Sequence, residues 1–197
     1  MEYVLQTNVL CKKYQKFTAL DNLTMHIPKG AIYGFIGKNG AGKTTLIRLL
    51  CGLQQPTSGE LSLYGTLHSQ PQIQNARKRI GAVVETPSIY LDMTAEENLR
   101  QQFQILGLPS YREISGLLQL VGLQDTGKKK AKHFSLGMRQ RLGIAIALCG
   151  NPDFLILDEP VNGLDPQGII EIRELILKLN RERQITSVSY THLRAHE

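Results

Sequence analysis

Residues 37–45 have the types and spacing of a loop that could bind phosphate. The run reads Gly-Lys-Asn-Gly-Ala-Gly-Lys-Thr-Thr and fits the pattern G-x-x-x-x-G-K-[ST]. Glycines let the backbone turn tightly and aim successive N–H groups inward, and a following helix adds its positive N-terminal end. In this pattern Lys43 reaches the β- and γ-phosphates of a nucleoside triphosphate, and the Thr44 hydroxyl ligates Mg²⁺. The candidate phosphate-binding residues are Gly37, Lys38, Asn39, Gly40, Ala41, Gly42, Lys43, Thr44 and Thr45.

Two adjacent carboxylates follow an apolar run further along the chain. Residues 154–157 are Phe-Leu-Ile-Leu, and Asp158 and Glu159 come next. Four consecutive apolar residues indicate a buried parallel strand, whose carboxyl end is where ligands bind in open α/β sheets. There Asp158 could hold Mg²⁺ through water, and Glu159 could polarise an attacking water. The alternative, a strand that merely ends in a charged turn, is disfavoured by the phosphate loop on the same chain.

Three further positions are weaker candidates when each is taken alone. Ser135 reads as the N-cap of a long apolar helix, and with Gly137 it leaves bare N–H groups that form a second anion site. Tyr14 lies among three lysines upstream of the phosphate loop, so it could stack on a base; a surface tyrosine is the alternative. Glu85 sits at the carboxyl edge of a short strand, or is a solvated loop carboxylate.

The flanking sequence predicts the elements that position these residues. Residues 2–27 read as antiparallel strands, and residues 94–150 look mainly helical. The remaining apolar runs predict strands at 31–36, 60–65, 80–84 and from 185, and helices at 45–50, 94–106, 111–121, 135–148 and 166–179. Thr94-x-x-Glu97 is a capping box, and Asp165-Pro166 is an N-cap followed by proline at the first helical position.

Composition favours an ordinary globular domain. The 197 residues suit one domain, with 42% hydrophobic and 20% charged residues. The apolar runs are too short to span a bilayer and no signal peptide is visible, so we expect a cytosolic chain. Cys11, Cys51 and Cys149 lack metal spacing and read as reduced thiols. The net charge of +6 fits a nucleic-acid or membrane-surface partner, but a solvated surface plus an anionic ligand is the favoured interpretation.

The end of the chain has an unusual composition. Residues 187–191 carry more hydroxyls than a central parallel strand usually does, and His192 follows them. Residues 188–197 resemble a translated sequencing adaptor. We therefore expect residues 187–197 to be a non-native tail and the natural sequence to be lost near Ser187.

Together these motifs resemble the nucleotide-binding subunit of an ATP-binding cassette (ABC) transporter over residues 1–186. Tyr14 matches the adenine-stacking aromatic, residues 37–45 the Walker A loop, and residues 155–159 the Walker B strand. Ser135 to Met138 with Gln140 match the signature loop, and Asn162 to Asp165 match the D-loop. The resemblance implies a nucleotide contact for Asp165.

The sequence departs from the family pattern at three places. The signature is normally Leu-Ser-Gly-Gly-Gln, whereas Leu136 and Met138 here replace a glycine and the glutamine. The Q-loop glutamine is Glu85, as in the subgroup that handles bacitracin and lantibiotics, and the resemblance makes it a metal-site residue. His192 falls near the place of the catalytic switch histidine, within the suspect tail.

The resemblance implies an α/β fold: a P-loop NTPase (RecA-like) core with an antiparallel β subdomain and an inserted α-helical subdomain. One domain would divide into residues 1–85 and 151–186 for the core and 86–150 for the helical part. The implied activity is ATP hydrolysis with ATP and Mg²⁺, in a head-to-tail homodimer or paired cassette. The implied partner is a membrane permease that exports an antimicrobial peptide or similar amphiphile, which would hold the chain at the inner face of the membrane.

Two other functions remain open from sequence. A cassette ATPase acting on nucleic acid or ribosomes is one, but such relatives usually carry two cassettes, a coiled-coil insertion or a zinc module, and none is visible. Nucleic acid is therefore not the expected partner. A small P-loop kinase is the other; it would explain residues 37–44 but neither the Ser135 loop nor the Asp158-Glu159 pair.

Overall fold

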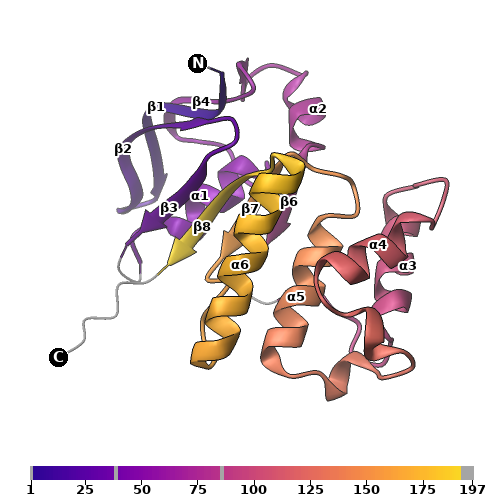
Figure 1. Cartoon of the computed structure of the whole chain (residues 1–197). Coiled ribbons are helices and arrows are strands. Elements are labelled where there is room, and N and C mark those ends of the chain that lie inside the picture. Colours follow the sequence, from indigo (N-terminus) through magenta and orange to yellow (C-terminus); the bar gives the residue numbers. More distant parts are fainter. Residues whose placement is uncertain (1, 38–39, 85–86, 192–197) are drawn as a thin grey trace.

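A parallel sheet brings the predicted phosphate loop and carboxylates to one edge. The computed structural model describes residues 2–37, 40–84 and 87–191 (Figure 1). Within this part, a four-stranded sheet has the order β3-β8-β7-β6, with all neighbouring strands parallel. Its strands are Ile32–Ile36 (β3), Thr186–Thr191 (β8), Phe154–Asp158 (β7) and Ile80–Val83 (β6). Because parallel strands end at the same edge, the segments that follow β3 and β7 meet there.

A second, antiparallel sheet is formed by the N-terminal half. Its described strands are Tyr3–Tyr14 (β1), Phe17–Pro28 (β2), Ser58–Leu63 (β4) and Thr66–Leu67 (β5), in the order β2-β1-β4-β5. This agrees with the prediction of antiparallel strands near the N-terminus. Strand β5 and the short helix α2 (Ile73–Arg77) were not predicted, because neither is long enough to show a periodic pattern.

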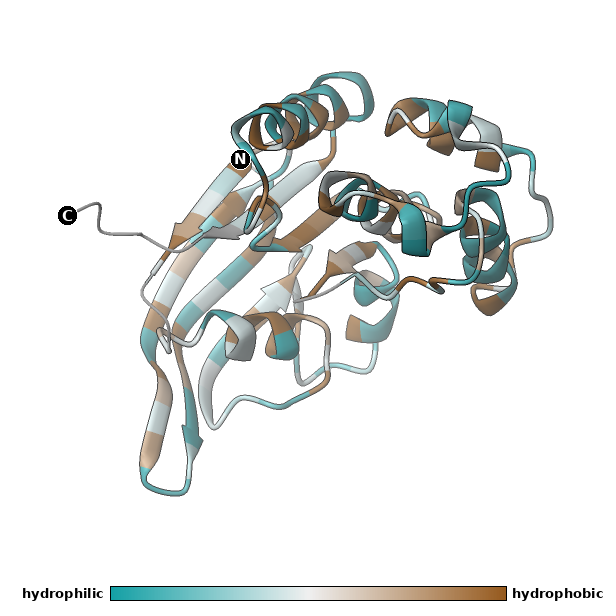
Figure 2. Ribbon diagram, turned by 90° about the horizontal axis from the view of Figure 1, so that it is seen from below, coloured by the Kyte–Doolittle hydropathy of each residue, from teal (hydrophilic) through white to brown (hydrophobic). Residues whose placement is uncertain are grey.

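Two helices cover opposite faces of the parallel sheet. Phe154 and Ile156 of β7 pack in one hydrophobic cluster with helix α1 (Lys43–Leu50). Leu155 and Leu157 pack in another with helix α6 (Pro166–Arg183). Since alternate residues of a strand face opposite sides, α1 and α6 lie on opposite faces. Figure 2 shows brown and teal positions on the same helices, as expected for elements with one buried side.

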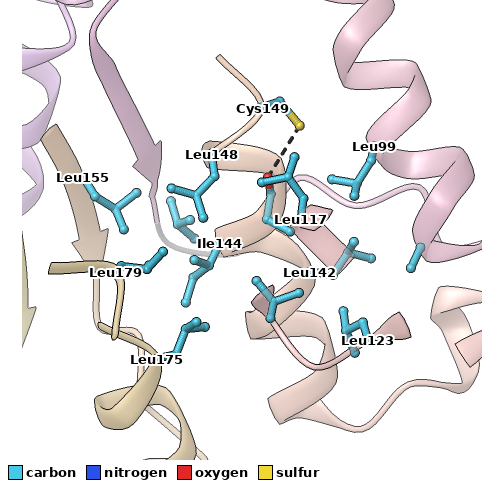
Figure 3. Packing of buried hydrophobic residues seen from close by; sticks show 14 of the residues in the cluster. Leu99, Leu117, Leu123, Leu142, Ile144, Leu148, Cys149, Leu155, Leu175 and Leu179 are labelled. Carbon is cyan, nitrogen blue, oxygen red and sulfur yellow. Dashed lines mark hydrogen bonds between the residues drawn. The ribbon is translucent and has the colours of Figure 1, made fainter. Parts of the chain in front are cut away.

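The helical part shares its core with the sheet. It contains α3 (Ala95–Ile105), α4 (Glu113–Leu120) and α5 (Leu136–Ala147), with two single turns at Gln124–Thr126 and Ala131–His133. Figure 3 shows Leu142, Ile144 and Leu148 between the helical side and Leu155, Leu175 and Leu179. Burial raises the pKa of the adjacent Cys149 thiol to about 12. Helix α5 therefore joins the two parts, so the positions of its ends are fixed relative to the sheet.

The helix caps predicted at Thr94 and Asp165 are confirmed. The Thr94 hydroxyl accepts the Glu97 N–H at 3.2 Å, and the Glu97 carboxylate accepts the Thr94 N–H at 2.7 Å, which completes the capping box. The Asp165 carboxylate accepts the Gly168 N–H at 3.0 Å, with Pro166 at the first helical position of α6. These caps satisfy N–H groups that have no partner inside their helices.

The hydroxyl-rich segment after Ile185 does form a central strand, contrary to the expectation from its composition. Strand β8 pairs with β3 on one side, from Ser187 to Thr191, and with β7 on the other, from Thr186 to Tyr190. Backbone pairing and the buried Val188 are sufficient for this, although the Ser187 hydroxyl is buried with no hydrogen-bond partner among the described residues. The non-native origin of residues 187–197 stays a prediction.

None of the helices in the described part of the chain has both the length and the apolar character that crossing a bilayer requires.

Candidate functional site

The phosphate loop connects β3 to α1. Gly42 has a φ of 80° and directly precedes α1, so the last turn of the loop uses a conformation that favours glycine. A Cβ atom on Gly42 would meet the Ala19 carbonyl oxygen at 2.2 Å, which shows how closely β2 passes the loop. The N–H groups at the start of α1 therefore border the cavity described below. Lys38 and Asn39 lie outside the described residues.

Lys43 is buried at the base of the loop. Its side chain is 6% exposed, and its ammonium donates to the Gly37 carbonyl oxygen at 2.7 Å. A buried ammonium needs acceptors to offset its desolvation. The side chain thus spans the loop from one end to the other, which holds the cation where the predicted phosphates would lie.

The two carboxylates follow β7 and face the same cavity. Asp158 is 5% exposed and is the last residue of the strand, whereas Glu159 is partly exposed. Glu159 has a φ of 50°, a conformation that is strained for a residue with a side chain. The turn holds it there, because the Asn162 N–H bonds the Glu159 carbonyl at 3.0 Å and the Asn162 amide donates to the Glu159 carboxylate at 3.1 Å.

These groups line one cavity of about 610 Å³, a size suited to a small-molecule ligand. Residues from four separate segments meet there. They are Phe17 and Ala19 of β2, residues 40–45 of the loop and α1, Leu136 and Gln140 of α5, and Asp158, Glu159 and Asn162 at the end of β7 and in the turn after it. The structure thus brings together most of the residues of the predicted phosphate loop and the predicted carboxylates.

Sequence reasoning gave no site role to Phe17, Leu136, Gln140 or Asn162. Leu136, Gln140 and Asn162 were noted only as parts of matching motifs, and Phe17 was passed over. No spacing in the sequence marks Phe17, because its place in the cavity depends on how β2 packs against the loop at Gly42.

Tyr14 is placed differently from Phe17. Its hydroxyl donates to the Gln54 side chain, and the Lys12 ammonium lies 5.2 Å from the centre of its ring. Tyr14 is not among the described residues that line the cavity. Its role in stacking on a base stays a prediction.

Ser135, Gly137 and Asp165 line a second hollow, of about 450 Å³. Ser135 caps α5 by accepting the Met138 N–H at 3.2 Å, and Asp165 caps α6. Both side chains are exposed. Two helix N-termini, each of which favours a negative charge, therefore open into one surface hollow that does not include Lys43.

The other predicted site residues fall outside the described part. Glu85 follows β6 and His192 follows β8, and both lie among the residues that the structure does not describe. The described residues contain no group of three or more His, Cys, Asp or Glu side chains that could hold a metal ion. Magnesium often needs only one or two protein oxygens because phosphates and water complete its shell, so Thr44 and Asp158 in one cavity fit that donor set.

Comparisons with known proteins find similarity to ABC transporter ATP-binding proteins. A family profile described as "ABC transporter" matches residues 20–162. The bacitracin transport ATP-binding protein BcrA of Bacillus licheniformis is 47% identical over 193 residues, which cover 98% of this chain and 63% of that protein. The lantibiotic transport ATP-binding protein SrtF of Streptococcus pyogenes is 44% identical over 186 residues, which cover 94% of this chain and 79% of that protein.

Solved structures confirm the predicted fold class. A structure of cbiO1 from Clostridium perfringens, part of the ABC transporter complex cbiONQ, matches with a TM-score of 0.86 and 29% identity over 98% of this chain and 79% of that one. A dimeric ATP-binding cassette in a post-hydrolysis state bound to ADP and Pi matches with a TM-score of 0.80 and 25% identity over 95% of this chain and 87% of that one.

The chain spans less than two thirds of several relatives. It covers 63% of the Bacillus licheniformis protein and 62% of an uncharacterised ABC transporter ATP-binding protein, YcbN, of Bacillus subtilis, to which it is 47% identical over 98% of its own length.

Proposed function

The chain belongs to the ABC transporter family, and on that premise we propose that it binds and hydrolyses ATP to drive a separate membrane permease. The observation that carries the proposal is the pair of phosphate-suited surfaces on one chain. One is the cavity around Lys43, and the other is the hollow around Ser135. The two hollows share Leu136 in their lining, but Lys43 lines only the first of them and Ser135 only the second.

Two chains paired head to tail resolve this separation. Each Ser135 hollow would then cover the triphosphate held in the partner's Lys43 cavity, which gives two complete sites per dimer. The N–H groups at the start of α5 would contact the terminal phosphate, and Asp165 would line the same seam. Binding of ATP would hold the halves together, hydrolysis would release them, and the permease would use that motion.

The residues around Lys43 take separate roles in hydrolysis. Lys43 would neutralise charge that builds on the transferring phosphoryl group. Glu159 would orient and polarise the attacking water, in a position fixed by the turn to Asn162. Thr44 and Asp158 would hold Mg²⁺, which supplies positive charge to the phosphate oxygens when bound. Glu85 and His192 stay candidates for the metal site and for catalysis, on family resemblance alone.

The proposed cargo is an antimicrobial peptide or a similar amphiphile, moved out of the cell or its membrane. The support is the likeness to proteins named for bacitracin and lantibiotic transport. Glu85, in place of the Q-loop glutamine, fits the same subgroup. The permease would hold the chain at the inner membrane face. A reading frame with about six membrane spans beside this gene would support the pairing, and its copurification with the chain would test it.

The test of the proposed function is a trapped dimer. Glu159→Gln keeps the shape of the side chain but removes the carboxylate that activates water, so ATP should bind and stay intact. We expect gel filtration of this variant to show a monomer alone and a dimer with ATP and Mg²⁺. Glu174→Gln, an exposed change on α6, should leave turnover intact and accumulate no dimer. A Glu159→Gln chain that binds ATP but stays monomeric would overturn the head-to-tail arrangement.

A further inference from the structure

Leu136 lies between the two hollows. Among the described residues it alone lines both of them, the cavity around Lys43 and the hollow around Ser135. It is the first residue of α5, directly after the Ser135 cap, and it is 45% exposed. Single exposed leucines are common on protein surfaces, so this exposure by itself indicates no function. The contacts of its side chain are more informative.

The side chain of Leu136 lies against Gly163, in the turn between β7 and α6. A Cβ atom on Gly163 would be only 3.2 Å from the Leu136 Cδ2 atom. At the next residue of each segment, a Cβ atom on Gly137 would be 3.8 Å from the Leu164 Cδ2 atom. Two successive residues of α5 therefore lie beside two successive residues of the turn. Leu136 stands where the usual signature has a glycine, and a glycine has no side chain with which to make the first contact.

The same turn holds Glu159. The Asn162 N–H bonds the Glu159 carbonyl oxygen at 3.0 Å, and the Asn162 amide donates to the Glu159 carboxylate at 3.1 Å. The Leu164 N–H bonds the Val161 carbonyl oxygen at 3.3 Å, and the turn ends at Asp165, which caps α6. Packed side chains and short hydrogen-bonded segments can carry a displacement from one site to another. A shift of the turn at its contact with α5 would therefore move the amide that bonds the Glu159 carboxylate.

We propose that Leu136 is a positioning residue for Glu159 of the same chain and acts through its contact with Gly163. This rests on the proposed hydrolysis of ATP in a head-to-tail dimer. In that dimer the start of α5 would cover the partner's terminal phosphate, and Leu136 would press on the turn as the two chains close. Glu159 would then be held in place for the attacking water. Each chain would thereby link the ATP that it covers to the ATP that it cleaves.

Steady-state ATPase kinetics of Leu136→Ala test the proposal. Alanine favours the helix but lacks the carbon atom that reaches Gly163, so kcat should fall about tenfold, within the range for coupling between two sites, with KM unchanged. Leu136→Met has a similar volume and reach, and should keep at least about half of the parent kcat. Leu177→Ala is the matched control, because Leu177 is 42% exposed on α6 and is not among the described residues that line either hollow. It should change neither kcat nor KM.

Dimer formation distinguishes a positioning residue from an interface residue. With ATP and Mg²⁺, Leu136→Ala combined with Glu159→Gln should form a dimer at the same protein concentration as Glu159→Gln alone. Gel filtration over a series of protein concentrations measures this. A weaker dimer, together with a kcat that returns to the parent value at high protein concentration, would mean that Leu136 only joins the two chains. That result would overturn the positioning role.

Gly163 gives a second test of the same contact. Gly163→Ala would press on Leu136 and would also strain a φ of 75°. Gly65→Ala is its control, because Gly65 has a φ of 76° but a Cβ atom there would meet nothing within 4 Å among the described residues. Gly163→Ala should lower kcat and Gly65→Ala should not, although both should lower the melting temperature. When Leu136→Ala and Gly163→Ala are combined, kcat should fall by less than the product of the two separate losses, since both disturb one contact. Independent losses would contradict the proposal.

The outcomes separate this proposal from the one on which it rests. If the parent chain hydrolyses ATP and Leu136→Ala keeps the parent kcat, Leu136 has no positioning role and the proposed function stands. A raised KM with normal kcat in Leu136→Ala, or a loss of kcat that Leu136→Met shares in full, would also overturn the role of Leu136 alone. A parent chain that does not hydrolyse ATP would overturn both proposals.

Discussion

The two hollows differ in how completely this chain encloses them. Around the phosphate loop, Lys43 and Asp158 are almost fully buried and residues from four segments line the cavity. Around the second hollow, Ser135 and Asp165 are exposed at the starts of α5 and α6. Buried charge strengthens electrostatic contacts with a ligand, whereas exposed helix ends are screened by water. The first hollow is therefore suited to hold a triphosphate alone, and the second gains strength only when another surface excludes water from it.

Glycines in the two hollows show the same contrast. A Cβ atom on Gly42 would clash with the Ala19 carbonyl, whereas one on Gly137 would meet only the Leu164 side chain, at 3.8 Å, among the described residues. The first surface is packed from within the chain. The second leaves room above its backbone, as a surface that receives a ligand from outside would.

The largest expected effect is from Lys43→Ala. The change removes a buried cation from the first hollow, so binding of ATP and of tripolyphosphate should weaken by more than about 100-fold. Calorimetric titration measures both. Lys178→Ala removes an exposed lysine of α6 and should bind both ligands normally. Unchanged affinity in Lys43→Ala would mean that the first hollow does not hold the phosphates.

Next in size is the difference between two substitutions in the same loop. Gly42→Ala combines a left-handed conformation with a clash against Ala19, and should destabilise the fold by about 2–5 kcal/mol and abolish ATP binding. Gly40 has a φ of 81°, but a Cβ atom there would meet nothing within 4 Å among the described residues. Gly40→Ala should therefore cost only about 1–2 kcal/mol.

Thermal unfolding and ATP titration of both glycine variants measure the difference. Equal losses of stability would show that backbone conformation alone governs the loop and that the approach of β2 does not matter. That result would remove one reason for concluding that β2 of the same chain packs against the loop and closes the first hollow.

A smaller effect is expected from Ser135→Ala in the second hollow. Loss of the cap to Met138 should cost about 1 kcal/mol of stability. ATP affinity of the separate chain should not change, but turnover should fall about tenfold, because in the proposed dimer this hydroxyl group would face the partner's phosphate. Thr94→Ala removes the cap of α3, away from both hollows, and should lose similar stability with normal turnover. If Ser135→Ala weakened ATP binding by the single chain, Ser135 would contribute to the first hollow, which would contradict the assignment of Ser135 to the second hollow alone.

The sequence predicted the parts of the site that follow from local chemistry. A glycine-rich run between a strand and a helix, and carboxylates after four apolar residues, each define their structure within ten residues. Ser135, Thr94 and Asp165 were predicted as helix caps for the same reason, since a cap and its N–H partner are three residues apart.

The site residues that could not be predicted from the sequence depend on contacts between segments that are far apart in the chain. Phe17 enters the cavity because β2 passes the loop at Gly42, a packing contact that no spacing rule records. Gln140 and Leu136 enter because α5 packs against the sheet, as the core in Figure 3 shows. The hydroxyls of β8 were misjudged for a related reason: partners on both sides, β3 and β7, outweigh a composition that is unfavourable in isolation.

The smallest expected effect concerns the link between the two hollows. Asn162 lines the first hollow and donates to the Glu159 carboxylate at 3.1 Å, and the hollow around Asp165 begins at the next residue, Gly163. Asn162→Ala removes one hydrogen bond that orients Glu159 and leaves Lys43 untouched, so kcat should fall by a few-fold, about the worth of one hydrogen bond, with KM unchanged. Steady-state ATPase kinetics measure both, and Asn75→Ala, an exposed change on α2, should alter neither. A raised KM with normal kcat would instead mean that Asn162 helps to bind ATP and does not orient Glu159 for catalysis. The turn after Glu159 would then serve only the first hollow and would not link it to the second.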